Sequence, residues 1–178
     1  MFKKVKRKMR EWLEVDRGNS LQDALDNGLK MGNNVQLIAT PNFGSEPYLI
    51  SIGDDCIISF DVTFITHDAT AYFVGKLPGE DPQTGYFGPI IIEDNCFIGC
   101  RTTILPDFRI GSGCIIGAGS IVNRDIPAGM VAAGNPCRVI CSLEEYRDKH
   151  KKKGDFLNIN LWSAEKKKDY LQKYFKID

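Results

Sequence analysis

The chain has 178 residues and a mass of 19.9 kDa, which is enough for one domain with a hydrophobic core and too little for a second full domain. Its formal net charge of zero argues against a general nucleic-acid-binding protein. No stretch approaches the ~18 apolar residues that a membrane span needs, and the basic N-terminus lacks the apolar region of a signal peptide. We therefore expect a cytoplasmic protein without a transmembrane segment.

Charge divides the chain into three zones. Residues 1–30 contain eight Lys or Arg and residues 142–178 contain ten, whereas residues 31–141 contain five against eleven Asp or Glu. We expect an N-terminal helical segment at 1–30, a central domain at 31–141 and a C-terminal helical extension at 142–178. The basic first segment leaves a peripheral membrane contact open, although a solvated helix face is the more common role of such residues.

Two helices are predicted in the first zone. Residues 2–13 place their apolar side chains on one side of a helix. A second helix is predicted over 20–28, because Ser20 and Asp23 have the spacing of an N-terminal cap and Gly28 is a common residue after a helix end.

The central zone repeats every six residues. A period of six does not fit the 3.6-residue turn of an α-helix, whereas short strands joined by tight corners produce it. The anchors of the repeat are Ile52, Ile58, Phe64, Ile92, Ile98, Ile104, Ile110, Ile116 and Val122. Four positions later, on the same side of an extended chain, come Cys56, Val62, Cys96, Thr102, Phe108, Cys114 and Ser120. The pattern predicts a β-helix with an interior column of anchors.

Glycine recurs one residue after several anchors, at Gly53, Gly99, Gly111 and Gly117. We expect these glycines to supply permissive backbone where the chain turns.

The repeat is interrupted between Phe64 and Ile92. Residues 68–89 are rich in Gly and Pro and are predicted to form a loop extruded from the coil, a common location for function. His67 lies at an odd offset from Phe64, so it should face away from the column, beside this loop. The alternative to a functional role is a hydrogen-bonded structural histidine at a loop boundary.

Two helices are predicted in the last zone. Ser142 and Glu145 have the spacing of a capping box, which opens a helix that ends near Gly154. A further helix is predicted from Ser163 to about Lys176, with Tyr170, Leu171, Tyr174 and Phe175 buried.

The six cysteines indicate neither a metal site nor disulfides. Two pairs have C-x3-C spacing, Cys96 with Cys100 and Cys137 with Cys141, but zinc sites use other spacings and ligand sets. A cytoplasmic location also disfavours disulfides. The repeat instead gives Cys56, Cys96 and Cys114 the role of small interior residues.

Three segments resemble a known family: IGDDCIISFDVTFITHD, FGSEPYLI and the long run from GPIIIEDNCFIG to IGAGSIVNRDIPAGMVAAGNPCRVI. Over residues 31–141 the chain resembles the hexapeptide-repeat acyltransferases, and most of all the acetyl-CoA-dependent sugar O-acetyltransferases of bacterial surface-polysaccharide synthesis. The resemblance implies an all-β core, a left-handed parallel β-helix with flanking helices, and a homotrimer with active sites between subunits. It also implies acetyl-CoA as donor, a sugar or other small hydroxylated acceptor, no metal and no nucleic acid.

The resemblance further implies roles for individual residues. His67 in the THD segment matches the family's general base. Glu46, Tyr48 and Phe97 match positions that contact or wall the acceptor. The positions that match acyl-CoA contacts are Cys100, Ala118, Asn123, Arg124 and Arg138.

The chemistry of acetyl transfer suits these residues. A base must take the proton of the acceptor hydroxyl as its oxygen attacks the thioester, and neutral imidazole, with a reference pKa of ~6.5, can do so near neutral pH. Backbone N–H groups at glycine-containing corners can stabilise the oxyanion. Asp68 is adjacent to His67 and should point the other way, so we expect a backbone carbonyl to orient the ring.

Several alternatives stay open. The acceptor can be a hydroxyl, the amine of an amino sugar or a streptogramin-type antibiotic, and the acyl group can be other than acetyl. A γ-type carbonic anhydrase needs three histidines to hold its zinc, and the chain has two. A non-catalytic β-helix assembly module would need the hexads, but neither the outward histidine nor the arginines.

Overall fold

The computed structural model describes residues 20–177, and the helix predicted over 2–13 lies outside them. The described residues form two compact units, which divide between Leu143 and Glu144. Among the described residues no helix is both long and apolar enough to cross a membrane.

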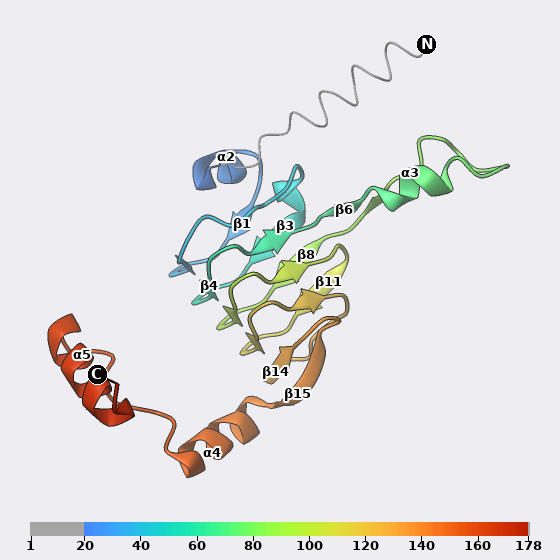
Figure 1. Ribbon diagram of the computed structural model, residues 1–178. Coiled ribbons are helices and arrows are strands. Elements are labelled where there is room, and N and C mark those ends of the chain that lie inside the picture. The colour runs from blue at the N-terminus through green and yellow to red at the C-terminus, as the bar shows by residue number, and fades with distance from the viewer. Residues whose placement is uncertain (1–19, 178) are drawn as a thin grey trace. The chain divides into compact units, whose positions relative to one another are not determined.

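The first unit is a stack of coils built from short strands in three sheets (Figure 1). One sheet contains, in spatial order, β1 (Lys30–Met31), β3 (Ile50–Ile52), β8 (Ile90–Ile92) and β11 (Phe108–Ile110). The second contains β5 (Thr63–Phe64), β10 (Thr103–Ile104) and β13 (Ile121–Val122). The third contains β2 (Gln36–Leu37), β4 (Ile57–Ile58), β9 (Phe97–Ile98), β12 (Ile115–Ile116), β14 (Met130–Ala133) and β15 (Arg138–Ser142). Pairing in these sheets is parallel except between β14 and β15.

The strand register follows the sequence repeat. Ile92 pairs with Ile110, Ile98 with Ile116, and Ile104 with Val122, so strand partners here are three hexads apart. One hexad therefore makes one side of a coil, and three hexads return the chain to the same sheet. The predicted parallel β-helix is confirmed in this architecture.

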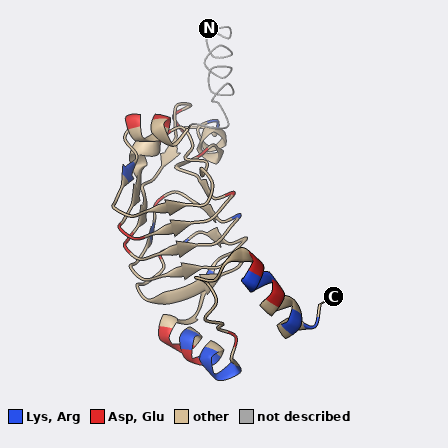
Figure 2. Cartoon of the chain, turned by 90° about the vertical axis from the view of Figure 1, so that its left-hand side faces the viewer, with Lys and Arg blue, Asp and Glu red and all other residues tan. Residues whose placement is uncertain are grey.

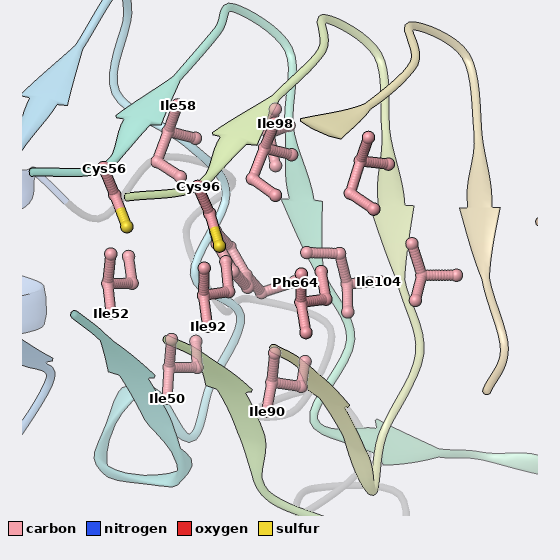
Figure 3. Close-up of a cluster of buried hydrophobic side chains, with 14 of the residues drawn as sticks. Ile50, Ile52, Cys56, Ile58, Phe64, Ile90, Ile92, Cys96, Ile98 and Ile104 are labelled. Carbon is pink, nitrogen blue, oxygen red and sulfur yellow. The ribbon is translucent and has the colours of Figure 1, made fainter. Parts of the chain in front are cut away.

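The anchors form the predicted interior column. Each of the nine is at most 3% exposed, and Figure 3 shows several of them pointing into the same core. The residues four positions later are buried too, except Phe108, which is half-buried. The stacked coils thus remove a continuous strip of β-branched side chains from water, at ~1.5–3 kcal/mol for each fully buried side chain.

The interior cysteines join successive coils. The thiol of Cys56 donates to the carbonyl of Glu93, that of Cys96 to Gly111, and that of Cys114 to Pro127, at 3.1, 3.2 and 3.0 Å. Burial raises the pKa of the Cys114 thiol, so it stays protonated at neutral pH. The role expected from the repeat, that of small interior residues, agrees with these contacts.

The glycines that directly follow the anchors do not supply the left-handed backbone at the corners, so the role predicted for them is wrong. The left-handed backbone needed at the corners lies three residues after seven of the nine anchors, all except Phe64 and Val122, with φ between 55° and 71°. This position holds Asp55, Asp61, Asn95, Arg101, Asp107 and Gly113, plus Gly119 at 70°. Gly99 is needed instead for close approach, because a Cβ there would lie 2.5 Å from the backbone nitrogen of Ala118 in the next coil.

The helix predicted over 20–28 is confirmed as α2 (Leu21–Asp26). Ser20 and Asp23 form a reciprocal capping box, and Gly28 has the left-handed φ of 92° that follows the helix end. Its Ala24 is fully buried in the core. The 3-10 helix η1 (Pro47–Leu49) follows β2 and leads into β3.

The interruption of the repeat forms an arm that projects from the stack in Figure 1. The arm, residues 67–87, begins with β6 (His67–Asp68), continues through α3 (Thr70–Val74) and returns in β7 (Tyr86–Phe87), which pairs antiparallel with β6. Its apolar side chains are exposed at Tyr72, Phe73, Val74, Leu77, Tyr86 and Phe87.

The second unit contains the two predicted C-terminal helices. They are α4 (Leu143–Lys153), after which Gly154 takes a left-handed φ of 72°, and α5 (Ala164–Phe175), capped by Ser163. The burial predicted for α5 is wrong: none of its residues is buried, and Tyr174 and Phe175 are 49% and 57% exposed. A helix of this unit has no large core to cover, so its aromatic residues contact one another, as Tyr170 does Tyr174.

Candidate functional site

His67 lies where the chain leaves the coil stack. The preceding anchor Phe64 is buried in the column, and β6 then starts the arm. The N–H of Gly88 donates to the carbonyl of Thr66 at 3.0 Å, so the two ends of the arm are joined beside the histidine. The ring of His67 is half-buried and contacts that of Phe87, with centroids 5.7 Å apart. The outward direction expected from its offset agrees with this position.

A buried carboxylate holds the imidazole. Glu46 Oε2 lies 2.8 Å from Nδ1 of His67 and also accepts a 2.7 Å hydrogen bond from the hydroxyl of Thr66. Its other oxygen accepts from the hydroxyl of Ser45 at 2.8 Å. A carboxylate at Nδ1 favours the tautomer with its proton on Nδ1, which makes Nε2 the basic nitrogen of the neutral ring.

The environment keeps Glu46 ionised. Burial raises the pKa of this carboxyl, but hydrogen bonds from Thr66, His67 and Ser45, together with the charge of His67, outweigh burial and hold the pKa below its usual value. Glu46 is 8% exposed, and such a buried charge is tolerated because both of its oxygens have donors.

The orientation of His67 differs from the sequence expectation. The contact at Nδ1 is a carboxylate from the preceding coil, where a backbone carbonyl was expected. Glu46 was expected at the acceptor, whereas here it lies behind the ring. Asp68, which the sequence did not pair with His67, accepts the N–H of Thr70 at 2.8 Å. The contact between Glu46 and His67 joins residues 21 positions apart, which no local spacing reveals.

A pocket of about 520 Å³ opens in front of His67. Its lining is mostly apolar and consists of Ile65, His67, Asp68, Ala69, Tyr86, Leu105, Pro106, Phe108 and Asn123. Ile65, Leu105 and Asn123 each directly follow an anchor, so they stack on the outer face of the sheet formed by β5, β10 and β13. The same repeat that marked the column could have identified these outward neighbours, which were missed except for Asn123.

The residues expected at the acceptor do not gather at this pocket. Tyr48 is 59% exposed on η1, and Phe97 is 39% exposed on β9, in a different sheet from the pocket wall. Neither residue lines the pocket.

The residues expected to bind acyl-CoA fall into two groups. Cys100 and Ala118 occupy equivalent positions in neighbouring coils, where the N–H of Gly119 donates to the carbonyl of Cys100 at 2.8 Å. The guanidinium of Arg138 donates to the side-chain oxygen of Asn123 at 3.4 Å and to the carbonyl of Cys137 at 2.7 Å.

The second group, which contains Asn123, Arg124 and Arg138, places positive charge near the pocket. Asn123 lines the pocket, and both Arg138 and Arg124 are exposed on the last coils. Exposed guanidinium groups are suited to phosphate binding. Over residues 20–177 no cluster of three or more His, Cys, Asp or Glu is arranged to hold a metal ion.

Comparison with known proteins agrees with this architecture. Residues 89–124 match the family described as bacterial transferase hexapeptide (six repeats). Protein CapG of Staphylococcus aureus is 36% identical over 154 residues, which span 84% of this chain and 85% of that protein. The galactoside O-acetyltransferase of Escherichia coli is 41% identical over 105 residues, but the match spans 59% of this chain and only 49% of the enzyme.

The fold also has a solved counterpart. The crystal structure of a hexapeptide-repeat-containing acetyltransferase from Vibrio cholerae aligns with a TM-score of 0.51 and 22% identity, over 78% of this chain and 89% of that one. The coil stack, its six-residue register and the extent of the match to CapG lead to one assignment. The chain belongs to the bacterial transferase hexapeptide family and is an acyltransferase of that family.

Proposed function

We propose that this acyltransferase moves an acetyl group from acetyl-CoA to a hydroxyl of a sugar acceptor, in the synthesis of a surface polysaccharide. The observation that carries the proposal is the imidazole of His67, held by Glu46 and facing a pocket. The similarity to a galactoside O-acetyltransferase supports a sugar hydroxyl as acceptor. The coil stack is then the left-handed β-helix that the sequence resemblance implies.

Attack and proton transfer occur together in this mechanism. Nε2 of His67 takes the proton from the acceptor hydroxyl while its oxygen attacks the thioester carbonyl carbon. The resulting oxyanion accepts hydrogen bonds from backbone N–H groups at the coil corners. Glu46 stabilises the positive charge that the imidazole gains, as a buried carboxylate behind a catalytic histidine does.

Collapse of the tetrahedral intermediate completes the reaction. The C–S bond breaks, the thiolate of CoA takes the proton from His67, and an ester and free CoA leave. The transfer is direct, because His67 activates the acceptor hydroxyl itself and the mechanism requires no covalent enzyme intermediate.

The competing acceptor is an amine. A Staphylococcus aureus tetrahydropyridine dicarboxylate N-acetyltransferase is 49% identical, but only over 63 residues and 26% of its own length. A streptogramin-type acceptor is a second alternative. The deciding experiment supplies acetyl-CoA with galactosides, maltose or glucosamine, measures released thiol and identifies the product by mass spectrometry. Base-labile acetyl esters of the sugars support the proposal, whereas turnover with glucosamine alone, or with none of these acceptors, contradicts it.

We further propose a homotrimer. The pocket is open to solvent, and the arm beside it exposes apolar side chains that a neighbouring copy would cover. Cyclic symmetry would then complete three equal sites. Light scattering of the purified protein should give the mass of three chains, and the mass of a single chain at micromolar concentration would refute the assembly.

Replacing His67 tests the general base. We expect His67→Ala to lower kcat by ~10²–10⁴-fold, the usual contribution of a positioned base. The protein should still fold, because the ring is not part of the column. His150→Ala in the second unit is the matched control and should keep wild-type kcat. Equal activity of the His67 variant would show that another group takes the proton.

Glu46→Gln tests whether the ionised carboxylate of Glu46 stabilises the folded protein. A carboxyl whose pKa is lowered in the folded state stabilises the protein at pH values above its unfolded-state pKa of 4.5, and that contribution is lost as pH falls through the folded-state pKa. Near neutral pH the variant should therefore be less stable than wild type, and the difference should shrink as pH falls below 4.5. Urea unfolding over a pH series measures this.

The exposed Glu80 provides the control for that series, because Glu80→Gln should stay close to wild type throughout. A stability difference for Glu46→Gln that does not change with pH would mean that packing alone, without the charge, is responsible.

Arg138 tests the proposed donor site. The 3′-phosphate and pyrophosphate of acetyl-CoA need cations in an otherwise acidic zone, so Arg138→Ala should raise the KM for acetyl-CoA by ~5–30-fold and leave the KM for the acceptor nearly unchanged. High salt should reduce the difference. Arg101→Ala, another exposed arginine, should have no such effect. Equal KM values at low salt would place the phosphates elsewhere.

A further inference from the structure

The connection between α4 and α5 exposes apolar side chains within an ordered segment. Leu161 is fully exposed at 102%, and Phe156 is 53% exposed. The backbone around them is hydrogen-bonded, because the N–H of Trp162 donates to the carbonyl of Ile159 at 3.1 Å. Ile159 itself is only 8% exposed. The segment 156–162 thus presents apolar groups to solvent from a defined conformation.

Two lysine triplets flank this segment. Lys151, Lys152 and Lys153 end α4, and the triplet from Lys166 to Lys168 lies in the first turns of α5. The ammonium group of Lys166 lies 4.2 Å from the centre of the Trp162 ring, and that of Lys167 donates to the carbonyl of Asn160 at 3.3 Å. The second triplet is therefore in contact with the apolar segment.

The second unit as a whole has a small excess of basic residues, to which the two triplets contribute six lysines. Residues 144–178 contain ten Lys or Arg against seven Asp or Glu. Figure 2 shows this concentration of charge on the two helices, whereas the coil stack is mostly uncharged. The apolar segment thus lies within the most densely charged part of the described chain.

We infer that the second unit binds the surface of an anionic lipid bilayer through the segment 156–162 and its two flanking lysine triplets. Leu161 and Phe156 enter the boundary between headgroups and acyl chains, Trp162 lies at headgroup depth, and the lysines contact lipid phosphates. The attachment is peripheral. It does not depend on the proposed acetyl transfer, because these residues belong to the second unit, whereas His67 and the pocket lining belong to the first.

The charges favour a bilayer over other occupants. A second copy of the unit meeting the first through this segment would bring lysine triplets of like charge together. A nucleic acid would neutralise the lysines but would leave the fully exposed aliphatic Leu161 in water or against phosphates. An anionic bilayer accommodates both the apolar side chains and the cations that surround them.

The test is cosedimentation of the full chain with vesicles of phosphatidylcholine alone and of equal parts phosphatidylcholine and phosphatidylglycerol. We expect binding to the anionic vesicles only, weakened by salt. Leu161→Ser should weaken binding by ~10-fold. Its control is Ile38→Ser, which removes an aliphatic side chain that is 62% exposed outside the arm and the second unit, and should have no effect.

The lysines are tested for position as well as charge. Changing Lys151, Lys152 and Lys153 to Gln should weaken binding by at least ~10-fold. Changing Lys149, Lys173 and Lys176 to Gln removes the same charge away from the segment and should have a clearly smaller effect. With Trp12 replaced by Phe, Trp162 is the sole tryptophan, and its emission should shift to shorter wavelength on anionic vesicles.

Four results would overturn the inference. These are no binding to anionic vesicles, equal binding to neutral vesicles, unchanged binding by both the Leu161 and the Lys151–Lys153 variants, or binding to duplex DNA without binding to vesicles. Unchanged binding by those variants would assign the attachment to another basic part of the chain. Self-association that Leu161→Ser abolishes, without vesicle binding, would show that a second copy covers the segment.

Discussion

The interior column of the coil stack is the constraint on which the rest of the structure depends. A coil this narrow has room for one anchor per side, and each anchor is almost completely buried. Parallel pairing stacks anchor on anchor, so every coil extends the same column. The corners must then adopt left-handed backbone at a fixed position, where Asp, Asn and Gly are tolerated best. The need to bury one anchor on each side of every coil thus determines the size of the side chains, the backbone conformation of the corners and the strand register.

The candidate site arises where that regularity stops. After Phe64 the chain leaves the column, and His67 takes a position that the repeat does not use. The preceding coil supplies Glu46, whose charge is tolerated in a buried position because Thr66, Ser45 and His67 surround its oxygens. A rigid stack therefore fixes an ionised carboxylate behind an imidazole. Such preorganisation suits a general base, because the ring does not have to reorient during the reaction.

The two units of the chain meet different physical demands. The coil stack buries the anchors of its repeat and carries few charges, whereas the second unit exposes aromatic and aliphatic groups among lysines. A pair of helices of this size buries too little surface to hide every apolar residue. In the second unit the exposed apolar residues and the lysine triplets share one segment, a combination that suits attachment to a charged surface.

The sequence by itself determined the β-helix, because aliphatic anchors with a period of six do not fit an α-helix, whereas short strands joined by tight corners produce them. It also determined the positions of α2, α4 and α5, since caps such as Ser20 with Asp23 depend on neighbours a few residues away. The expectation that His67 faces outward rested on its odd offset from Phe64, whereas its role as general base came from the family resemblance. Only the tertiary structure decided that Glu46 lies behind His67, that Gly99 serves close approach between coils, and that the aromatic residues of α5 stay exposed. The first two features depend on contacts between different coils, and the third depends on how much core is available to cover a helix. The spacing of neighbouring residues in the sequence encodes neither.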